Sequence, residues 1–246
     1  MNNKTFLKIL AGIIAFLLIF AVFFIANSFL GNPVSANIAK SKAQTYITDK
    51  YGHLSLEIKD VAYNLKDGYY VISVSSSTSI DTHFLLSYGA GEIFRDDYES
   101  SVLSSMNTMD RLCDEYKKSL TPLVQAKTND VTYISVIPEK LTKYNLGLDS
   151  AFDTKLVKNV DLAVRYTGGI EAKHFSEILK IIYGVMKDNG FVATNFEITG
   201  EHETVLAELR NIKPKHIENE NLEEILQKAI TNAEYDGITA FSKGQK

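Results

Sequence analysis

The sequence feature that most constrains this chain is an uninterrupted apolar segment at residues 9–30, ILAGIIAFLLIFAVFFIANSFL. A helix rises about 1.5 Å per residue, so this segment would reach roughly 33 Å and match a hydrocarbon core of about 30 Å. Cleavable signal peptides have shorter apolar regions of about 7–15 residues, although Val34-Ser35-Ala36 would suit a signal peptidase. We therefore expect an uncleaved transmembrane signal anchor, with a cleaved signal peptide and a buried soluble helix as alternatives.

The charges that flank this segment predict its orientation. Lys4 and Lys8 lie in the leader at residues 1–8, whereas no basic residue follows the segment until Lys40. The positive-inside rule then predicts a cytoplasmic N-terminus, with the bulk of the chain extracytoplasmic and held at the cell membrane by a single pass. The opposite orientation stays open, because Lys40 and Lys42 also lie close enough to count.

The remaining residues, 31–246, have the composition of a globular protein. They carry 24 Lys and Arg against 30 Asp and Glu, a formal charge of −6, with the two signs interspersed. This balance opposes binding to nucleic acid, which requires basic patches. A single cysteine, Cys113, excludes an intrachain disulfide, so the chain must fold without one.

Periodicity predicts an α+β fold with two small helix-plus-antiparallel-sheet domains, at residues 31–127 and 128–246. Asn32 and Pro33 suit the start of a helix, and Lys66-Asp67-Gly68 suits a hairpin turn between strands that have an irregularity near Asp60. The polar stretch at residues 126–130 marks the domain boundary. In the first domain we expect a helix at 33–51, strands at 54–65, 69–76 and 79–88, and a helix at 97–120 that ends before Pro122.

The second domain follows the same pattern of helices and strands. A hairpin is expected around Gly200-Glu201, and the last helix is expected to be capped by Asn221 and ended by Gly237. The expected strands are 131–137, 156–166, 191–199 and 204–210, and a helix is expected at 171–187.

In the first domain, the helix at 97–120 is expected to pack across the preceding sheet, with a short coiled coil as the alternative.

No motif in the sequence identifies a reaction, so the catalytic residues are unknown, and no cofactor or metal is expected. No two of the five histidines share a helix face, and Cys113 lies on an expected core stripe. A phosphate loop at residues 88–92, a cation site among Glu218, Glu220, Glu223 and Glu224, and an anion site at Gly168-Gly169 all have simpler interpretations as turns or helix starts. The histidines are His53, His83, His174, His202 and His216.

The front end of the chain resembles the YfjL-like family of uncharacterised membrane-anchored Firmicutes proteins. The likeness lies in the apolar helix, in Gly31-Asn32-Pro33-Val34-Ser35, and in the segment from Ala39 to Gly52. The resemblance implies N-terminal and C-terminal YfjL-like domains, the first similar to PepSY and cystatin-like folds. It implies no reaction or catalytic residue.

The favoured hypothesis from sequence is therefore a non-catalytic module that binds a protein or peptide near the bilayer, or that has a regulatory role there. An open sheet edge can pair with a peptide, and the Ser-rich segment at residues 73–79 is a candidate edge. The alternative is an envelope hydrolase whose site assembles only in three dimensions and involves His83, His174 or Asp81.

Overall fold

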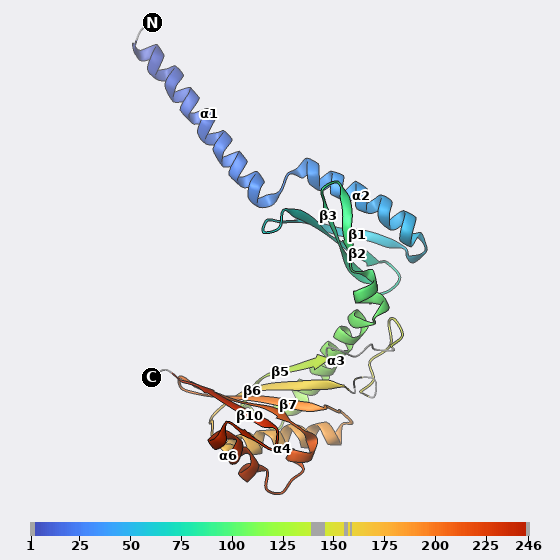
Figure 1. Cartoon of the computed structure of the whole chain (residues 1–246), viewed down its shortest axis with the longest axis vertical. Helices are drawn as coiled ribbons and strands as arrows, with labels where there is room; N and C mark the ends of the chain where they lie inside the picture. Colours follow the sequence, from blue (N-terminus) through green and yellow to red (C-terminus); the bar gives the residue numbers. More distant parts are fainter. Residues whose placement is uncertain (1–2, 139–145, 155–156, 158, 245–246) are drawn as a thin grey trace. The chain divides into compact units, whose positions relative to one another are not determined.

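The computed structural model describes residues 3–138, 146–154, 157 and 159–244. The chain forms two compact units, residues 1–107 and 108–246. Each unit contains its own β-sheet (Figure 1). The expected α+β fold with two sheets is therefore present. The predicted boundary at 127/128 concerns domains that fold independently, and it stays a prediction.

The first unit is a four-stranded antiparallel meander, in the order β1-β2-β3-β4, covered by one helix. A bulge between Ile58 and Asp60 confirms the expected irregularity. Its elements are α1 (Asn3–Leu30), α2 (Pro33–Tyr51), the short helix η1 (Gly52–Leu54), β1 (Leu56–Asn64), β2 (Tyr69–Ser76), β3 (His83–Gly89), β4 (Glu92–Asp96) and the π-helix η2 (Glu99–Leu103).

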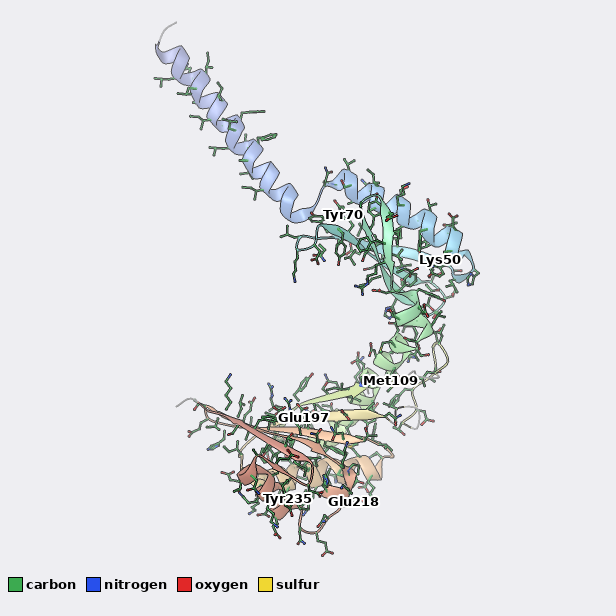
Figure 2. All side chains as sticks on the ribbon, viewed as in Figure 1. Lys50, Tyr70, Met109, Glu197, Glu218 and Tyr235 are labelled. Atoms are coloured by element: carbon green, nitrogen blue, oxygen red, sulfur yellow. The ribbon has the colours of Figure 1, made fainter. Side chains whose placement is uncertain are left out.

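Capping and packing fix α2 against this sheet. The Asn32 side chain accepts a hydrogen bond from the Val34 amide at 2.8 Å, and Pro33 is at the first helical position, as predicted. Tyr70 of β2 is labelled in Figure 2. Its hydroxyl accepts a hydrogen bond from the Asn32 amide and donates one to the Asn32 carbonyl, each at 3.0 Å. Ala39, with other small and apolar residues of α2, then buries against the inner faces of β2 and β3 in one core.

The expected transmembrane anchor is not supported by α1. Within the part of the chain whose structure is described, no helix is both long and apolar enough to cross a membrane. This finding contradicts three expectations. The fold would have included a transmembrane helix, and the chain would have bound the membrane through that helix. The protein would also have been a single-pass protein of the cell membrane, with a cytoplasmic N-terminus and the bulk of the chain extracytoplasmic.

The second unit is built around a six-stranded mixed sheet in the order β5-β6-β7-β8-β10-β9. Strands β6 and β7 are parallel and joined through α4, whereas the other neighbours are antiparallel, so this sheet is not the purely antiparallel one expected. Its elements are α3 (Met106–Gln125), β5 (Val131–Pro138), β6 (Val160–Thr167), α4 (Ala172–Asp188), β7 (Asn195–His202), β8 (Val205–Ile212), α5 (Pro214–Ile217), α6 (Leu222–Asn232), β9 (Glu234–Tyr235) and β10 (Ile238–Lys243).

Side-chain alternation gives this sheet one buried and one open face. In β6 the even-numbered residues are buried, and in β7 the even residues from 196 to 200 are buried as well. These positions form one core with the apolar stripes of α3, α4 and α6, which include Met109, Phe175 and Leu226. The odd-numbered residues of β6 and β7 lie on the opposite face of the sheet.

Two expectations for α3 are wrong. Its buried residues, Met109 and Tyr116 among them, belong to the core of the second sheet rather than of the preceding one. The helix also passes Pro122 and ends at Gln125. A proline near a helix end removes a hydrogen bond and crowds the turn before it, and apolar contacts such as that of the buried Val124 offset this cost.

The hairpin of β7 and β8 turns later than predicted. Gly200 and Glu201 lie inside β7, and the turn falls at Glu203-Thr204. A Cβ atom on Gly200 would lie 2.7 Å from the carbonyl oxygen of Gly169, so a close backbone approach rather than a turn requires this glycine. Strands β4 and β10 were not predicted, and Asn221 precedes α6 without a capping bond from its side chain.

Candidate functional site: the open face of the second sheet

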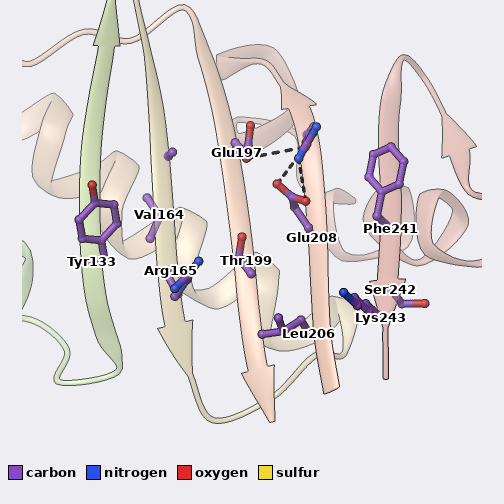
Figure 3. A pocket seen from close by; sticks show the side chains of 12 residues that line it. Tyr133, Val164, Arg165, Glu197, Thr199, Leu206, Glu208, Phe241, Ser242 and Lys243 are labelled. Carbon is purple, nitrogen blue, oxygen red and sulfur yellow. Dashed lines mark hydrogen bonds and ion pairs between the residues drawn. The ribbon is translucent and has the colours of Figure 1, made fainter. Parts of the chain in front are cut away.

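The candidate site is the uncovered face of the six-stranded sheet, which we call the open face (Figure 3). It is a shallow concavity of about 550 Å³ that spans strands β5, β6, β7, β8 and β10. Its side chains combine charged, polar and apolar groups. The lining residues include Tyr133, Arg165, Glu197, Thr199, Leu206, Glu208, Arg210, Phe241 and Lys243.

Strand register brings these side chains together from distant parts of the sequence. Tyr133 of β5 pairs with Arg165 of β6, and Arg165 pairs with Thr199 of β7. Thr199 in turn pairs with Glu208 of β8, which pairs with Phe241 of β10. One row therefore crosses the sheet from an aromatic ring at one side to an aromatic ring at the other.

Ion pairs link neighbouring strands along this face. Arg210 is bidentate to Glu208, with Nε–Oε1 at 2.8 Å and Nη2–Oε2 at 3.0 Å, and its Nε lies 3.7 Å from Oε1 of Glu197. Arg165 Nε lies 3.4 Å from Oε1 of Glu201. Because these groups are partly exposed, we expect the pairs to order the side chains more than they stabilise the fold.

Glu197 and Glu208 behave as a coupled carboxyl pair. A hydrogen bond with Glu208 is the main cause that raises the pKa of Glu197 to about 7, and partial burial and the charge of Glu208 add to it. The pKa of Glu208 is lowered, chiefly by the same hydrogen bond and also by Arg210, although its burial acts in the opposite direction. Near neutral pH Glu197 is therefore only partly protonated, whereas Glu208 is a carboxylate.

Two exposed aromatic rings lie toward the sides of the open face. The side chain of Phe241 is 54% exposed and its ring centre lies 5.3 Å from Cζ of Arg210. Tyr133 is 51% exposed, and Nζ of Lys117 lies 4.8 Å from its ring centre. Exposed aromatic residues with neighbouring cations are typical of protein-binding surfaces.

The geometry of this face does not suit hydrolysis by two carboxyl groups. Glycoside hydrolases hold their two carboxyl groups about 5–9.5 Å apart, so that the scissile bond fits between them. Glu208 and Glu197 instead share one guanidinium, with Nε of Arg210 lying 2.8 Å from Oε1 of Glu208 and 3.7 Å from Oε1 of Glu197, so a cation rather than a scissile bond lies beside both carboxyl groups. The concavity is also broad and shallow rather than water-excluding.

The residues of the hydrolase alternative do not form a catalytic arrangement in the described structure. His83 of β3 is exposed in a surface concavity of about 500 Å³, where the Asp97 carboxylate is paired with Nε of Arg95 at 2.8 Å. Asp81 is buried, only 1% exposed. His174 lies in the other unit, at the surface, where its Nδ1 is 2.9 Å from Glu171.

The remaining motifs have structural roles. Residues 88–92 form the tight β3–β4 hairpin, with Ala90 and Gly91 at positive φ, rather than a phosphate loop. At Gly168-Gly169 the start of α4 already holds an anion, because the Glu171 carboxylate accepts the Ile170 amide at 3.1 Å. Among the described residues, no group of His, Cys, Asp and Glu could hold a metal ion.

The expected Ser-rich edge is also wrong. The strand that contains Ser73, Ser75 and Ser76 is β2, which lies between β1 and β3 and is not at an edge. Ser76 and Ser77 instead donate side-chain hydrogen bonds to the carbonyls of Leu54 and Ser55. The serines therefore hold the end of β2 against the preceding segment.

Cys113 and His216 both lie in the protein interior. Cys113 is buried, as expected, and burial raises the pKa of its thiol to about 12. Nδ1 of His216 accepts the Lys213 amide at 3.0 Å, and its Nε2 lies 3.4 Å from Asp236. Burial lowers the pKa of His216, so the ring is a neutral anchor for α5.

Sequence reasoning missed the open face, although it left a signal. In the segments that became β7 and β8, polar residues alternate with apolar ones at Glu197, Thr199 and Glu201, and again at Glu208 and Arg210. This alternation indicates one solvent-facing side for each strand. Which of these residues meet was decided by the bulges between Phe196 and Ile198 and between Val131 and Tyr133.

Comparisons with known proteins bear mainly on the first unit. Curated proteins give no match. Among solved structures, the chain is similar to the crystal structure of a DUF5037 family protein from Ruminococcus gnavus ATCC 29149, with 14% identity over 83% of this chain and 90% of that chain. The TM-score of 0.21 is too low for this likeness to support an argument.

A family model gives a more specific result. The part of the chain that matches this model lies in the first unit, and the match shows neither membrane anchoring nor a Firmicutes source. It covers α1, α2 and the first sheet, and so supports the resemblance noted for the front end of the sequence. Residues 6–97 match the model of the YfjL-like N-terminal domain.

Proposed function

We propose that the chain is a non-catalytic module that binds a protein or peptide through the open face. The observation that carries this proposal is the one-sided cover of the second sheet. Helices α3, α4 and α6 bury one face, whereas the other presents Phe241, Tyr133 and a network of ion pairs to solvent. A broad, shallow and chemically mixed surface suits a protein partner better than a small substrate.

The arrangement of the open face suits an extended or flat partner. Phe241 and Tyr133 provide apolar contacts at separated points, and both are large enough to act as binding anchors. Between them, Thr199 and the Arg210–Glu208 pair offer donors and acceptors that are already oriented by their neighbours. Such preorganisation lowers the entropic cost of binding.

Site-specific photo-crosslinking in cells tests this proposal. A photoreactive phenylalanine analogue would replace Phe241 or Tyr133 on the open face, and Gln227 on the exposed side of α6 would provide the matched control. We expect both open-face positions to crosslink to the same protein, identified by mass spectrometry and different from this chain, and Gln227 not to do so.

The recovered protein then permits a quantitative test with purified components. Phe241→Ala should weaken its binding about 10-fold, the loss expected for a partly exposed aromatic anchor. Charge reversal by Arg210→Glu should also weaken it, because two carboxylates would lose their counter-charge. Binding unchanged in both variants, or the same crosslinks from Gln227, would refute the open face as the binding surface.

A further inference from the structure

The edges of the two sheets differ in how they are protected from pairing with another chain. Exposed strand edges usually carry charges, bulges or prolines that prevent such pairing. In the first sheet, edge strand β1 contains Glu57, Lys59 and Asp60 with a bulge in the middle, and edge strand β4 contains Glu92, Arg95 and Asp96. Both edges therefore have the expected protection.

Strand β5 is the exception among the described edge strands. It is terminal in the second sheet, pairs only with β6, and has the sequence VTYISVIP over eight residues without one charge. The opposite edge, by contrast, is the two-residue β9, which contains Glu234. An uncharged, β-branched edge of this length is favourable for strand addition.

We propose that β5 pairs antiparallel with β5 of a second copy of this chain, centred on Ser135. The register follows from the two irregular points of the strand. The bulge between Val131 and Tyr133 interrupts pairing at one end, and Pro138 interrupts it at the other. The regular segment between them, residues 133–137, is symmetric about Ser135.

This register is self-complementary. A twofold axis through Ser135 places Tyr133 of each copy opposite Ile137 of the other, so the dimer contains two such pairs. These side chains lie on the open face and are 51% and 38% exposed in the single chain, so pairing would cover apolar surface at both points. An aromatic ring opposite a β-branched side chain is a favourable cross-strand pair.

Electrostatics does not oppose the pairing. Among the residues that the structure describes, the cation beside this edge is Lys117, with Nζ 4.8 Å from the Tyr133 ring centre. In the proposed register the two Tyr133 residues are offset by four residues along the strands, roughly 13 Å at about 3.3 Å per residue. That separation exceeds the Debye length of about 8 Å at physiological salt, so repulsion between the two lysines is screened.

Pairing would join two open faces into one surface. Directly opposed residues of antiparallel strands point to the same side of a sheet, so both copies would present their open faces on one side. The proposed function does not require this dimer, and the dimer does not require a bound partner. The two proposals can therefore fail separately.

Cysteine crosslinking of the full chain tests the register. Directly opposed Cα atoms in antiparallel strands lie about 4.5–5.5 Å apart, within the range of a disulfide, whereas Ile137 would be roughly 13 Å from its own copy. Under mild oxidation, Ser135→Cys should give a dimer of twice 27.5 kDa on non-reducing gels, at least ten-fold more than Ile137→Cys. An equal mixture of Tyr133→Cys with Ile137→Cys should give about half the yield of Ser135→Cys, because random pairing joins the two variants in only half of the dimers. The wild-type chain, whose Cys113 is buried, is the blank.

Two outcomes separate this interface from other association. Contacts through the exposed apolar side chains of α1 would not favour position 135 over position 137, so equal crosslinking at both would overturn the proposal. A second variant, Ser135→Lys, should abolish the mixed Tyr133→Cys and Ile137→Cys crosslink, with hydrogen exchange in β6 and β7 showing that the sheet persists. Amides of β5 should also lose protection at least ten-fold on dilution. Protection that does not change with dilution would mean that something other than a second copy covers this edge.

Discussion

Asp96→Ala is expected to loosen the first unit selectively, because this carboxylate joins α2 to β4. Its Oδ2 accepts hydrogen bonds from the hydroxyls of Tyr46 at 2.8 Å and Tyr51 at 2.6 Å, and from Nζ of Lys50 at 2.8 Å. Its Oδ1 accepts the Tyr98 amide at 3.0 Å. Burial acts to raise the pKa of Asp96, but these hydrogen bonds outweigh it and lower the pKa, so the group is a carboxylate at neutral pH.

The size of the effect follows from the exposure of each partner. Tyr51 is 7% exposed, so its hydroxyl would lose a charged acceptor in a buried setting, at a cost of about 1.5–3 kcal/mol. Tyr46 is less buried and adds about 1 kcal/mol. The Lys50 side chain is 50% exposed, so its ion pair adds less than about 1 kcal/mol. The expected total for Asp96→Ala is about 2.5–5 kcal/mol of lost stability in the first unit.

Hydrogen exchange followed by mass spectrometry is the suitable assay, because it reports the two units separately whereas a global unfolding curve mixes them. A loss of 3 kcal/mol corresponds to roughly 100-fold faster exchange of slowly exchanging amides in β2 and β3. Asp97→Ala is the control, since Asp97 pairs with the 62% exposed Arg95 side chain and should cost less than about 1 kcal/mol. If Asp96→Ala were no more damaging than Asp97→Ala, the buried network would not hold α2 in place.

Three further predictions concern the second unit. The side-chain carboxyl of Glu197 should titrate with an apparent midpoint near pH 7 by ¹³C NMR. In Glu208→Gln that midpoint should move down toward about 4.3. An unchanged midpoint would show that Glu208 does not raise the pKa of Glu197. Burial lowers the pKa of His216, so the stabilising effect of this side chain should be complete above about pH 6.5 and lost as the pH falls through the folded-state pKa. Amide exchange in α5 should show this loss in the wild type but not in His216→Gln. Gly200→Ala should destabilise this unit by about 1–3 kcal/mol in thermal unfolding, because its Cβ would lie 2.7 Å from a carbonyl oxygen, whereas Gly184→Ala, with no atom within 4 Å, should be neutral or stabilising.

Local signals in the sequence predicted most of the elements. The Asn32 cap, the turn at residues 66–68, the irregularity near Asp60 and the amphipathic helix α4 were all confirmed. Each depends on residues within a few positions of one another, such as a side chain that caps its own helix or a period that marks one face. Such signals survive when the tertiary structure is unknown.

Interpretations that depended on tertiary context were less successful. Gly200 was interpreted as a turn residue, yet it allows β7 to approach the backbone at Gly169. The apolar stripe of α3 was real, but a stripe does not specify which sheet it packs against. The apolar segment at residues 9–30 likewise predicted a membrane span from its composition, and the described part of α1 did not support one.

The sequence by itself thus determined where most of the helices and strands form and which side of each is apolar, because these properties depend on nearest neighbours in the chain. Only the tertiary structure decided that Glu197, Glu208 and Arg210 meet on one open face, and that β5 rather than the Ser-rich β2 lies at an edge. The physical reason is register. A shift of one residue in strand pairing moves every side chain to the other face, and the bulges that set this register arise only when the strands pair.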